Sequence, residues 1–292
     1  MRGWTRALLG GVQEKLAGRD LALIAAGLTF YAGIAVVPLL VLSFSLTAWL
    51  TSAERVRELG NRVAELLPPE LGAPDAVARL VDAGVGLSPL QGLLALLPMS
   101  LYGEGLRRAL LRFSAQEEAM TAWRGRFAAL PLLIVAPLLL YPLLLAADVM
   151  ADLAESGGTW PTVGRIAVGF YACLAALALP LAWGFRVVGG GQVRWPALFS
   201  GALFTAACVS GFLQGFVLFL ALPVDLGAPF GGLTVVGGVV ALGFWLWLLH
   251  MVVLGGWLLT RSLDELLAAR RTRPAEPGDH HGAGRPACSP PG

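Results

Sequence analysis

Charge is scarce in this chain of 292 residues, which has 14% charged and 57% hydrophobic side chains. A soluble domain carries roughly a quarter charged residues, which it needs to cover its surface. The composition therefore excludes a soluble globular protein and predicts an all-α, polytopic membrane protein. The formal net charge is only +2, and without a strongly basic surface we expect no nucleic-acid partner.

Cysteine is almost as scarce. The three cysteines, Cys173, Cys208 and Cys288, form no Cys-x-x-Cys pair, which excludes a disulfide framework. Cys173 and Cys208 lie in apolar segments, so we expect them to pack as small apolar residues.

Catalytic and metal-binding motifs are also missing. The chain has no Gly-x-Ser-x-Gly elbow, no phosphate-binding loop of the Walker type and no His-Glu-x-x-His sequence. Its one cluster of metal-ligand types, Asp279, His280 and His281, lies in a tail rich in proline and glycine without further ligands. We therefore expect no catalytic residue, metal site or cofactor. We also expect that the chain is not an enzyme and does not drive transport with ATP by itself.

Long apolar runs dominate what remains. The 30 residues from Leu21 to Leu50 carry no charge, and as a helix they reach about 45 Å, more than the roughly 30 Å of the hydrocarbon core. A cleaved signal peptide is shorter, so we expect a retained span. The predicted membrane domain, residues 20–260, has six spans, at about residues 21–50, 88–103, 127–147, 163–185, 196–222 and 231–260.

The distribution of basic residues supports six spans. With the N-terminus assigned to the cytoplasm, 16 of the 21 basic residues fall in inner segments and five in outer ones, as the positive-inside rule requires. Without the second span, five basic residues from Arg107 to Arg126 would move to the outside. We therefore expect both termini in the cytoplasm.

Polar segments flank the predicted spans. In the outer insert, residues 51–87, Thr51 and Glu54 make a capping box, and apolar residues at helical spacing predict an amphipathic helical hairpin. This hairpin either caps the outer end of the bundle or docks a partner protein. Residues 1–19 predict an interfacial amphipathic helix on the cytoplasmic side. Residues 261–273 predict a cytoplasmic helix end, and residues 274–292 a disordered tail.

Three arginines near the inner end of the second span are candidate lipid ligands. Arg107, Arg108 and Arg112 lie within six residues, and Glu104 can pair with Arg108 at i, i+4. Guanidinium groups at the membrane surface attract anionic headgroups. We therefore expect these arginines to bind membrane lipid, and the alternative is that they only fix topology.

Polar side chains at membrane depth are costly, so each is a functional candidate. These are Tyr31, Tyr102, Asp148, Arg165, Gln214 and His250. Asp148 ends the third span and Arg165 begins the fourth, so we expect the two to pair. For His250, the only imidazole within a span, a hydrogen-bonded packing role is favoured over a proton relay. The two tyrosines either line a cavity or pack.

Small residues and prolines indicate how the spans pack. Small residues four apart let helix backbones approach closely, which predicts the tightest contact between the last two spans, within one chain or between two copies. These residues are Ala207, Gly211, Gly215, Gly237, Gly238 and Ala241. Prolines predict kinks that open a cavity, at Pro38, Pro98, Pro137, Pro142 and Pro180.

The first span resembles the opening of a known family. Asp20 precedes residues 25–31 (AAGLTFY) and residues 37–40 (VPLL), a string similar to the YihY/BrkB family of bacterial inner-membrane proteins. The outer insert, residues 105–110 (GLRRAL) and the glycines at 231 and 232 follow in the same order. The resemblance covers about residues 20–260 and implies a multi-pass protein of the bacterial plasma (inner) membrane.

One position departs from the family pattern. Members commonly end the last span with Gly-Ala-Glu, whereas this chain has Gly255, Gly256 and Trp257. The family's molecular activity is unsettled: it carries a virulence-factor label and a ribonuclease label, and these residues give the ribonuclease label no support.

The chain combines proline-kinked helices with a basic inner rim and has no catalytic residues. This combination favours translocation or handling of a lipid or other amphiphile. The alternative is a non-transporting envelope scaffold that binds a partner through the outer hairpin. A homo-oligomer and an envelope partner protein are both left open.

Overall fold

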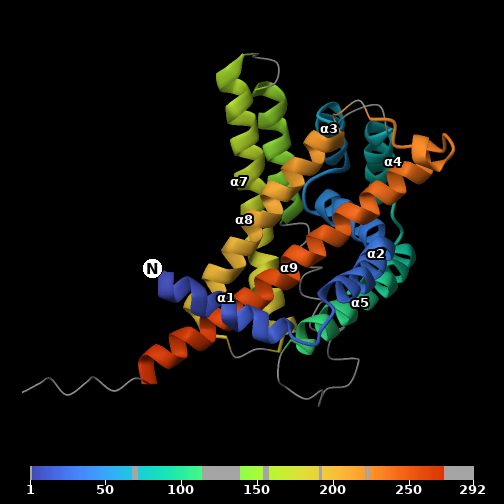
Figure 1. Ribbon diagram of the computed structural model, residues 1–292. Helices are drawn as coiled ribbons and strands as arrows, with labels where there is room; N and C mark the ends of the chain where they lie inside the picture. Colours follow the sequence, from blue (N-terminus) through green and yellow to red (C-terminus); the bar gives the residue numbers. More distant parts are fainter. Residues whose placement is uncertain are drawn as a thin grey trace, which may run out of the picture.

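The computed structural model describes residues 2–67, 72–113, 139–153, 158–190, 193–220, 222 and 224–272. Every regular element in that part of the chain is a helix, as the sequence predicts (Figure 1). The predicted span at residues 127–147 is described only from residue 139. Pro137, Cys288, the cluster at residues 279–281 and the predicted tail at residues 274–292 lie outside the described residues.

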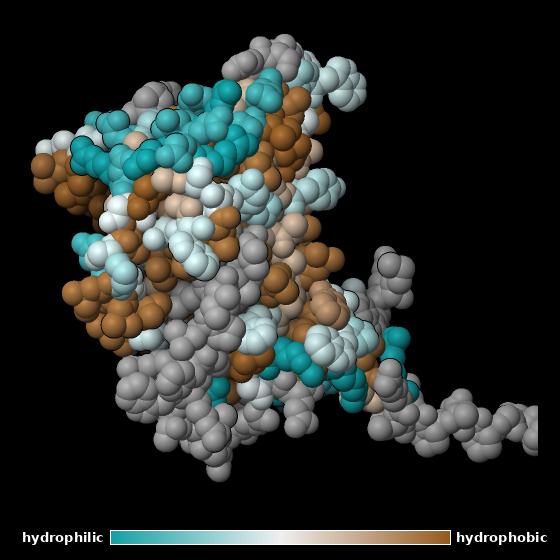
Figure 2. Space-filling view, turned by 180° about the vertical axis from the view of Figure 1, so that it is seen from behind, coloured by the Kyte–Doolittle hydropathy of each residue, from teal (hydrophilic) through white to brown (hydrophobic). Residues whose placement is uncertain are grey.

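Four helices of the described part are long and apolar enough to cross a membrane. They are α2 (Leu21–Leu50), α7 with its π-helical extension η2 (Thr159–Trp183 and Gly184–Val188), α8 (Trp195–Leu220) and α9 (Thr234–Thr272). They expose large apolar side chains, among them Phe30 on α2 and Val239 on α9. Figure 2 shows a largely apolar band between hydrophilic groups at the two ends of one face. A surface of this kind suits contact with lipid rather than water.

The predicted second span lies within α5 (Pro89–Arg112), which is not one of these four helices. Ser88 begins α5 with a capping box, in which its side chain accepts from the Gln91 backbone N–H at 3.3 Å and Gln91 Oε1 accepts from the Ser88 N–H at 3.0 Å. Glu104 and the three arginines occupy its second half, and their charge lowers the hydropathy of the helix.

Helix α9 organises the centre of the molecule, where it crosses α2 and α8 (Figure 1). Its Trp257, Leu254 and Leu258 belong to one buried cluster with Leu28 of α2 and Leu110 of α5. Helix α1 (Arg2–Leu16) lies along the C-terminal half of α9.

The contact between α1 and α9 is both apolar and ionic. Val12 and Leu16 pack against the central cluster, and Lys15 Nζ forms a 2.5 Å ion pair with Glu265 of α9. One face of α1 is therefore used inside the protein, while Leu9 remains 60% exposed.

Helices α8 and α9 approach most closely at two glycines. A Cβ atom at Gly201 of α8 would overlap Thr260 of α9, and one at Gly256 of α9 would overlap Thr205 of α8. Each threonine hydroxyl donates 2.7 Å to the carbonyl of the glycine four residues before it on its own helix. Two antiparallel Gly-x-x-x-Thr segments therefore face each other, an arrangement that allows backbone contact between membrane helices.

The predicted stripe of small residues is not this contact. A Cβ at Gly211 would lie 3.9 Å from Phe170 of α7, and a Cβ at Gly215 would lie 3.8 Å from Trp245. A Cβ at Gly238 would have no neighbour within 4 Å among the described residues. Gly237 instead packs on the loop at Leu226, and Ala207 and Ala241 are half-buried. The reason is that aromatic rings separate the helices here: the rings of Phe212 and Phe216 are tilted against Trp245, with centroid distances of 4.4 and 5.1 Å.

Helices α3 (Ala53–Glu65) and α4 (Ala73–Val85) pack on each other and on α2. Their Val56, Leu59 and Val81 join Phe44 of α2 and Leu144 in a second buried cluster. The capping prediction at Thr51 is wrong: Ser52 caps α3 by accepting from the Arg55 N–H at 3.1 Å. Thr51 is unsuited because it ends α2, where its hydroxyl donates to the Thr47 carbonyl at 2.8 Å.

Prolines lie inside several of these helices. Pro38 is in α2, Pro98 in α5 and Pro180 in α7, while Pro142 is in the helix at residues 139–153. Four residues after Pro180 the backbone changes to the π-helical η2. A π segment within a long helix is a recognised response to a disturbed hydrogen-bond ladder.

Candidate functional site

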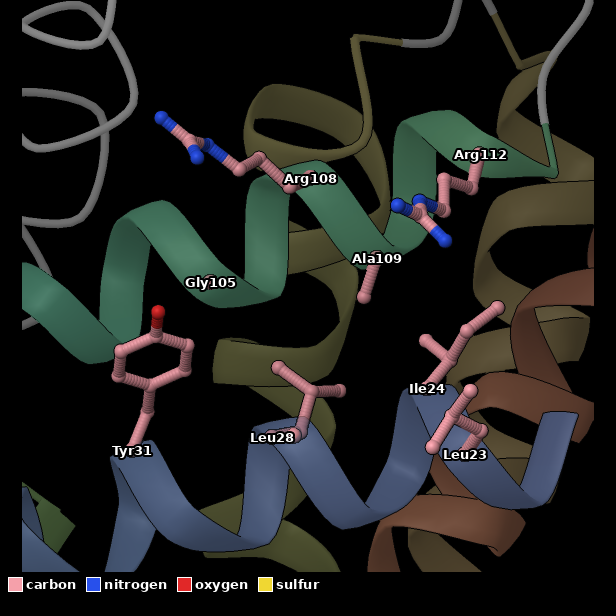
Figure 3. Close-up of a pocket in the computed structure, with 9 residues that line it drawn as sticks. Leu23, Ile24, Leu28, Tyr31, Gly105, Arg108, Ala109 and Arg112 are labelled. Carbon is pink, nitrogen blue, oxygen red and sulfur yellow. The ribbon is translucent and has the colours of Figure 1, made fainter.

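An open groove lies between the first half of α2 and the second half of α5 (Figure 3). We call it the arginine groove; its volume is about 320 Å³. Helix α2 contributes Leu23, Ile24, Gly27, Leu28 and Tyr31, and α5 contributes Gly105, Arg108, Ala109 and Arg112. Two cationic side chains therefore stand beside a wall that is otherwise almost entirely apolar.

Helical spacing places the two arginines on one side of α5. Arg108 and Arg112 are four residues apart, and Gly105 and Ala109 occupy the same side with small side chains. The close approach of α2 requires the glycine, because a Cβ at Gly105 would lie 2.7 Å from the ring of Tyr31. Tyr31 thus lies in the groove, packed on α5.

Both groove arginines are exposed at the mouth. Arg108 Nε donates to Glu104 Oε1 at 2.7 Å, the i, i+4 pair that the sequence predicts. The other oxygen, Glu104 Oε2, is buried without a hydrogen-bond partner among the described residues. Among the described residues at the mouth, Glu104, Arg108 and Arg112 sum to one positive charge, which favours an anion.

The third predicted lipid ligand does not join this groove. Arg107 is only 7% exposed, and it is absent from the groove lining. One residue along a helix turns the side chain by about 100°, so Arg107 points away from Arg108. The predicted rim of three arginines is therefore a pair at the groove and one buried arginine.

His250 of α9 connects three helices. Its Nδ1 lies 2.7 Å from the Leu246 carbonyl and 3.3 Å from Thr29 Oγ1 of α2, and its Nε2 lies 3.3 Å from the Tyr102 hydroxyl of α5. A carbonyl only accepts, so Nδ1 carries a proton and donates it to the Leu246 carbonyl. The imidazole is hydrogen-bonded at both nitrogens, and it is 4% exposed.

The structure brings two of the predicted polar residues together here and separates the others. Tyr102 and His250 are partners, whereas Tyr31 lies in the arginine groove. Thr29 was not a sequence candidate, although it belongs to the AAGLTFY string that carries the family resemblance. The side-chain amide of Gln214 packs over Gly169 of α7, where a Cβ would lie 2.6 Å from its Nε2.

Asp148 does not have the predicted partner. Its carboxylate lies 3.6 Å from Arg62 Nε and 4.0 Å from Arg55 Nη2, both on α3, and Arg165 is half-buried on α7. The pairing of Asp148 with Arg165 is therefore wrong. Leu144, one turn before Asp148, packs with Val56 and Leu59, which directs this side of the helix toward α3. The hydrogen bond that Arg55 donates to Glu58 raises the pKa of Arg55.

Trp257, which follows Gly255 and Gly256 on α9, is completely buried. Its Nε1 donates to the Leu110 carbonyl at 3.0 Å, and its ring centroid lies 5.3 Å from that of Phe185. The indole thus joins α9 to the end of α5 and to η2. Trp257 is therefore a packing residue whose one donor is satisfied.

Comparisons with known proteins agree with a membrane assignment. The chain is 28% identical over 262 residues to a UPF0761 membrane protein of Rhodospirillum centenum, an alignment that covers 86% of this chain and 56% of that protein. The chain therefore spans little more than half the length of this relative. No solved structure matches. The pattern of the virulence factor BrkB family matches residues 12–280, and the chain is accordingly a multi-pass membrane protein that belongs to the virulence factor BrkB family.

Proposed function

We propose that the protein binds an anionic amphiphile of the bacterial plasma membrane in the arginine groove and moves it between the leaflets. The observation that carries this proposal is the composition of the groove, whose lining combines Arg108 and Arg112 of α5 with apolar side chains of α2. A guanidinium group forms charge-assisted hydrogen bonds with phosphate or carboxylate. The adjacent apolar wall suits the body of the same molecule.

The proposal includes six spans with both termini in the cytoplasm. Helix α5 then crosses the membrane despite its charged second half, and one observation favours this: its exposed side chains before Ser100 form a leucine stripe. These are Leu90, Leu93, Leu94 and Leu97, each more than half exposed. A stripe of this kind at i, i+3, i+4 and i+7 needs an apolar neighbour, and lipid supplies one.

The rival proposal is a scaffold that binds an envelope partner through α3 and α4. Their apolar residues Val56, Leu59 and Val81 are buried against α2 and the helix at residues 139–153. Because that face is already used inside the protein, a partner would meet mainly charged side chains. The packing thus favours a cap over a docking surface, and lipid movement remains our proposal.

A reconstitution experiment tests the proposal. Purified protein in vesicles is supplied with fluorescent phosphatidylglycerol or phosphatidylcholine, and binding and exchange between leaflets are measured. We expect a preference for the anionic lipid that falls roughly thirtyfold in Arg108→Gln/Arg112→Gln, because each of the two interfacial charges contributes on the order of 1 kcal/mol. The added changes Gln116→Arg and Ala119→Arg keep the number of inner charges constant.

Two controls make the outcome specific. Arg57→Gln/Arg79→Gln removes two exposed charges from α3 and α4 and should leave the preference unchanged. Inorganic phosphate, added as a competitor, separates a lipid site from a free-phosphate site. Equal binding of the two lipids by the parent protein, or displacement of the anionic lipid by phosphate alone, would contradict the proposal.

A further inference from the structure

A second cavity lies where α2, α5, α8 and α9 meet. Its volume is about 230 Å³. Eight aliphatic side chains line it, among them Ala35, Leu39, Val209 and Val253, together with Tyr102 and His250. We call it the histidine cavity.

The two polar residues that line the histidine cavity, Tyr102 and His250, already have hydrogen-bond partners. The Tyr102 hydroxyl is hydrogen-bonded to His250 Nε2, and His250 Nδ1–H donates to the Leu246 carbonyl. A water molecule needs two to four polar partners to occupy a cavity, and this wall has both of its donors engaged. The histidine cavity is therefore suited to an apolar occupant rather than to water, an ion or a polar solute.

An apolar pocket of this size can hold a ligand. An aliphatic cavity of about 150 Å³ is already large enough to take up benzene. The histidine cavity exceeds that size. A flexible hydrocarbon chain matches both its volume and its chemistry.

Helices α2 and α5 contribute to both the arginine groove and the histidine cavity, and on α2 the two linings are adjacent in sequence. On α2 the groove uses residues 23–31 and the cavity residues 32–39, while on α5 Tyr102 precedes Gly105 by one turn. From Gly27 to Val36 the α2 axis advances about 13 Å. The cationic site and the apolar site thus follow each other along α2 in the order in which a lipid presents its headgroup and its chain.

We propose that the histidine cavity receives an acyl chain of the anionic lipid whose headgroup binds at Arg108 and Arg112. This proposal rests on the proposed function and adds a second determinant of substrate choice. The groove selects the charge of the headgroup, and the cavity selects the length of the chain. His250 and Tyr102 serve as a fixed wall of the chain site.

Cavity filling tests the proposal in the full-length protein. Ala35→Leu adds three carbon atoms inside the histidine cavity, and Ala26→Leu adds the same atoms at an exposed position of α2. Affinities are measured by native mass spectrometry for phosphatidylglycerol with eight-carbon or sixteen-carbon chains. We expect the parent and Ala26→Leu to prefer the longer lipid. Ala35→Leu should reduce that preference about fivefold or more, since each buried methylene contributes substantially to lipid binding.

The design separates the two proposals. Ala35→Leu should keep the preference for phosphatidylglycerol over phosphatidylcholine, whereas Arg108→Gln/Arg112→Gln should lose that preference and keep the dependence on chain length. An unchanged length dependence in Ala35→Leu would overturn the chain site while leaving the headgroup site intact. A parent protein without any headgroup preference would instead overturn the proposed function.

Photocrosslinking of the unaltered chain provides a second measurement, which does not depend on how a variant folds. Phosphatidylglycerol with a diazirine within one acyl chain is bound, illuminated and located by peptide mass spectrometry. We expect adducts within residues 32–39 and 246–253 that unlabelled phosphatidylglycerol reduces. Adducts confined to exposed positions such as Phe30 and Val239, or adducts that the competitor does not reduce, would overturn the proposal.

Discussion

At the scale of single residues, Trp257 combines packing with one directed hydrogen bond. We expect Trp257→Phe to keep most of the ring contact with Phe185 and to lose the bond to the Leu110 carbonyl. A net loss of about 1 kcal/mol follows from removing one such bond, visible as a lower thermal unfolding temperature in detergent. Trp160→Phe, at a position that is 84% exposed, serves as the control. Equal unfolding temperatures for the two variants would show that the bond contributes nothing.

His250 offers a second test at this scale. Its two nitrogens are engaged by Leu246 and Tyr102, and Asp or Glu is absent from the lining of the histidine cavity. We therefore expect His250→Gln to fold and to keep the parent's dependence of lipid exchange on pH between about pH 5.5 and 8, where a free imidazole titrates. The measurement is lipid exchange across that range. A shifted profile, with normal expression, would instead assign His250 to a proton relay.

Single residues also show which side-chain contacts can be predicted from the sequence and which cannot. The pair Glu104–Arg108 follows from i, i+4 spacing and is present. The burial of Arg107 does not follow from spacing, because the side of α5 that turns inward is decided by α2 and α9. Asp148 meets Arg62, 86 positions earlier in the chain, and local sequence holds no signal for a partner so distant.

At the scale of elements, the contact between α8 and α9 depends on two glycines. We expect Gly256→Ala to destabilise the protein by about 1–3 kcal/mol, as overpacking does, because its methyl group would overlap Thr205. Gly211→Ala has room for its methyl group and should be neutral or stabilising by up to about 1 kcal/mol through helix propensity. Thermal unfolding in detergent measures both.

A rescue variant makes this prediction specific to the helix contact. Thr205→Ala removes the atoms nearest to the new methyl group, so Gly256→Ala/Thr205→Ala should regain part of the stability that Gly256→Ala loses. Additive losses in the double variant would contradict close packing at this point.

The sequence contains the motif that forms this contact, but it does not show which of two similar motifs forms it. Gly-x-x-x-Thr occurs at residues 201–205 and 256–260, and small residues recur at the same spacing at residues 207–215. Spacing shows which residues share a face of a helix. It does not show that Phe212, Phe216 and Trp245 separate the helices at one end.

At the scale of the whole molecule, the composition is sufficient to predict an all-α membrane protein. The order of the sequence motifs is sufficient to indicate the family. The number of spans depends on α5, whose arginines lower its hydropathy while its leucines remain exposed. Neither the groove nor the cavity is a property of one segment. Both arise where α2 meets α5, and they require the packing of helices that are far apart in the chain.

The orientation in the membrane is the last prediction, and it follows from the distribution of 16 inner and five outer basic residues. In a chain without its three native cysteines, Asn61→Cys in α3 and Gly278→Cys beyond α9 are each labelled with a membrane-impermeant maleimide on intact cells and on opened cells. We expect position 61, which is exposed, to react on intact cells and position 278 only after the membrane is opened. An odd number of spans would place the C-terminus outside when the N-terminus is inside, so labelling of both positions on intact cells would exclude six spans. That result would overturn the six-span part of the proposed function.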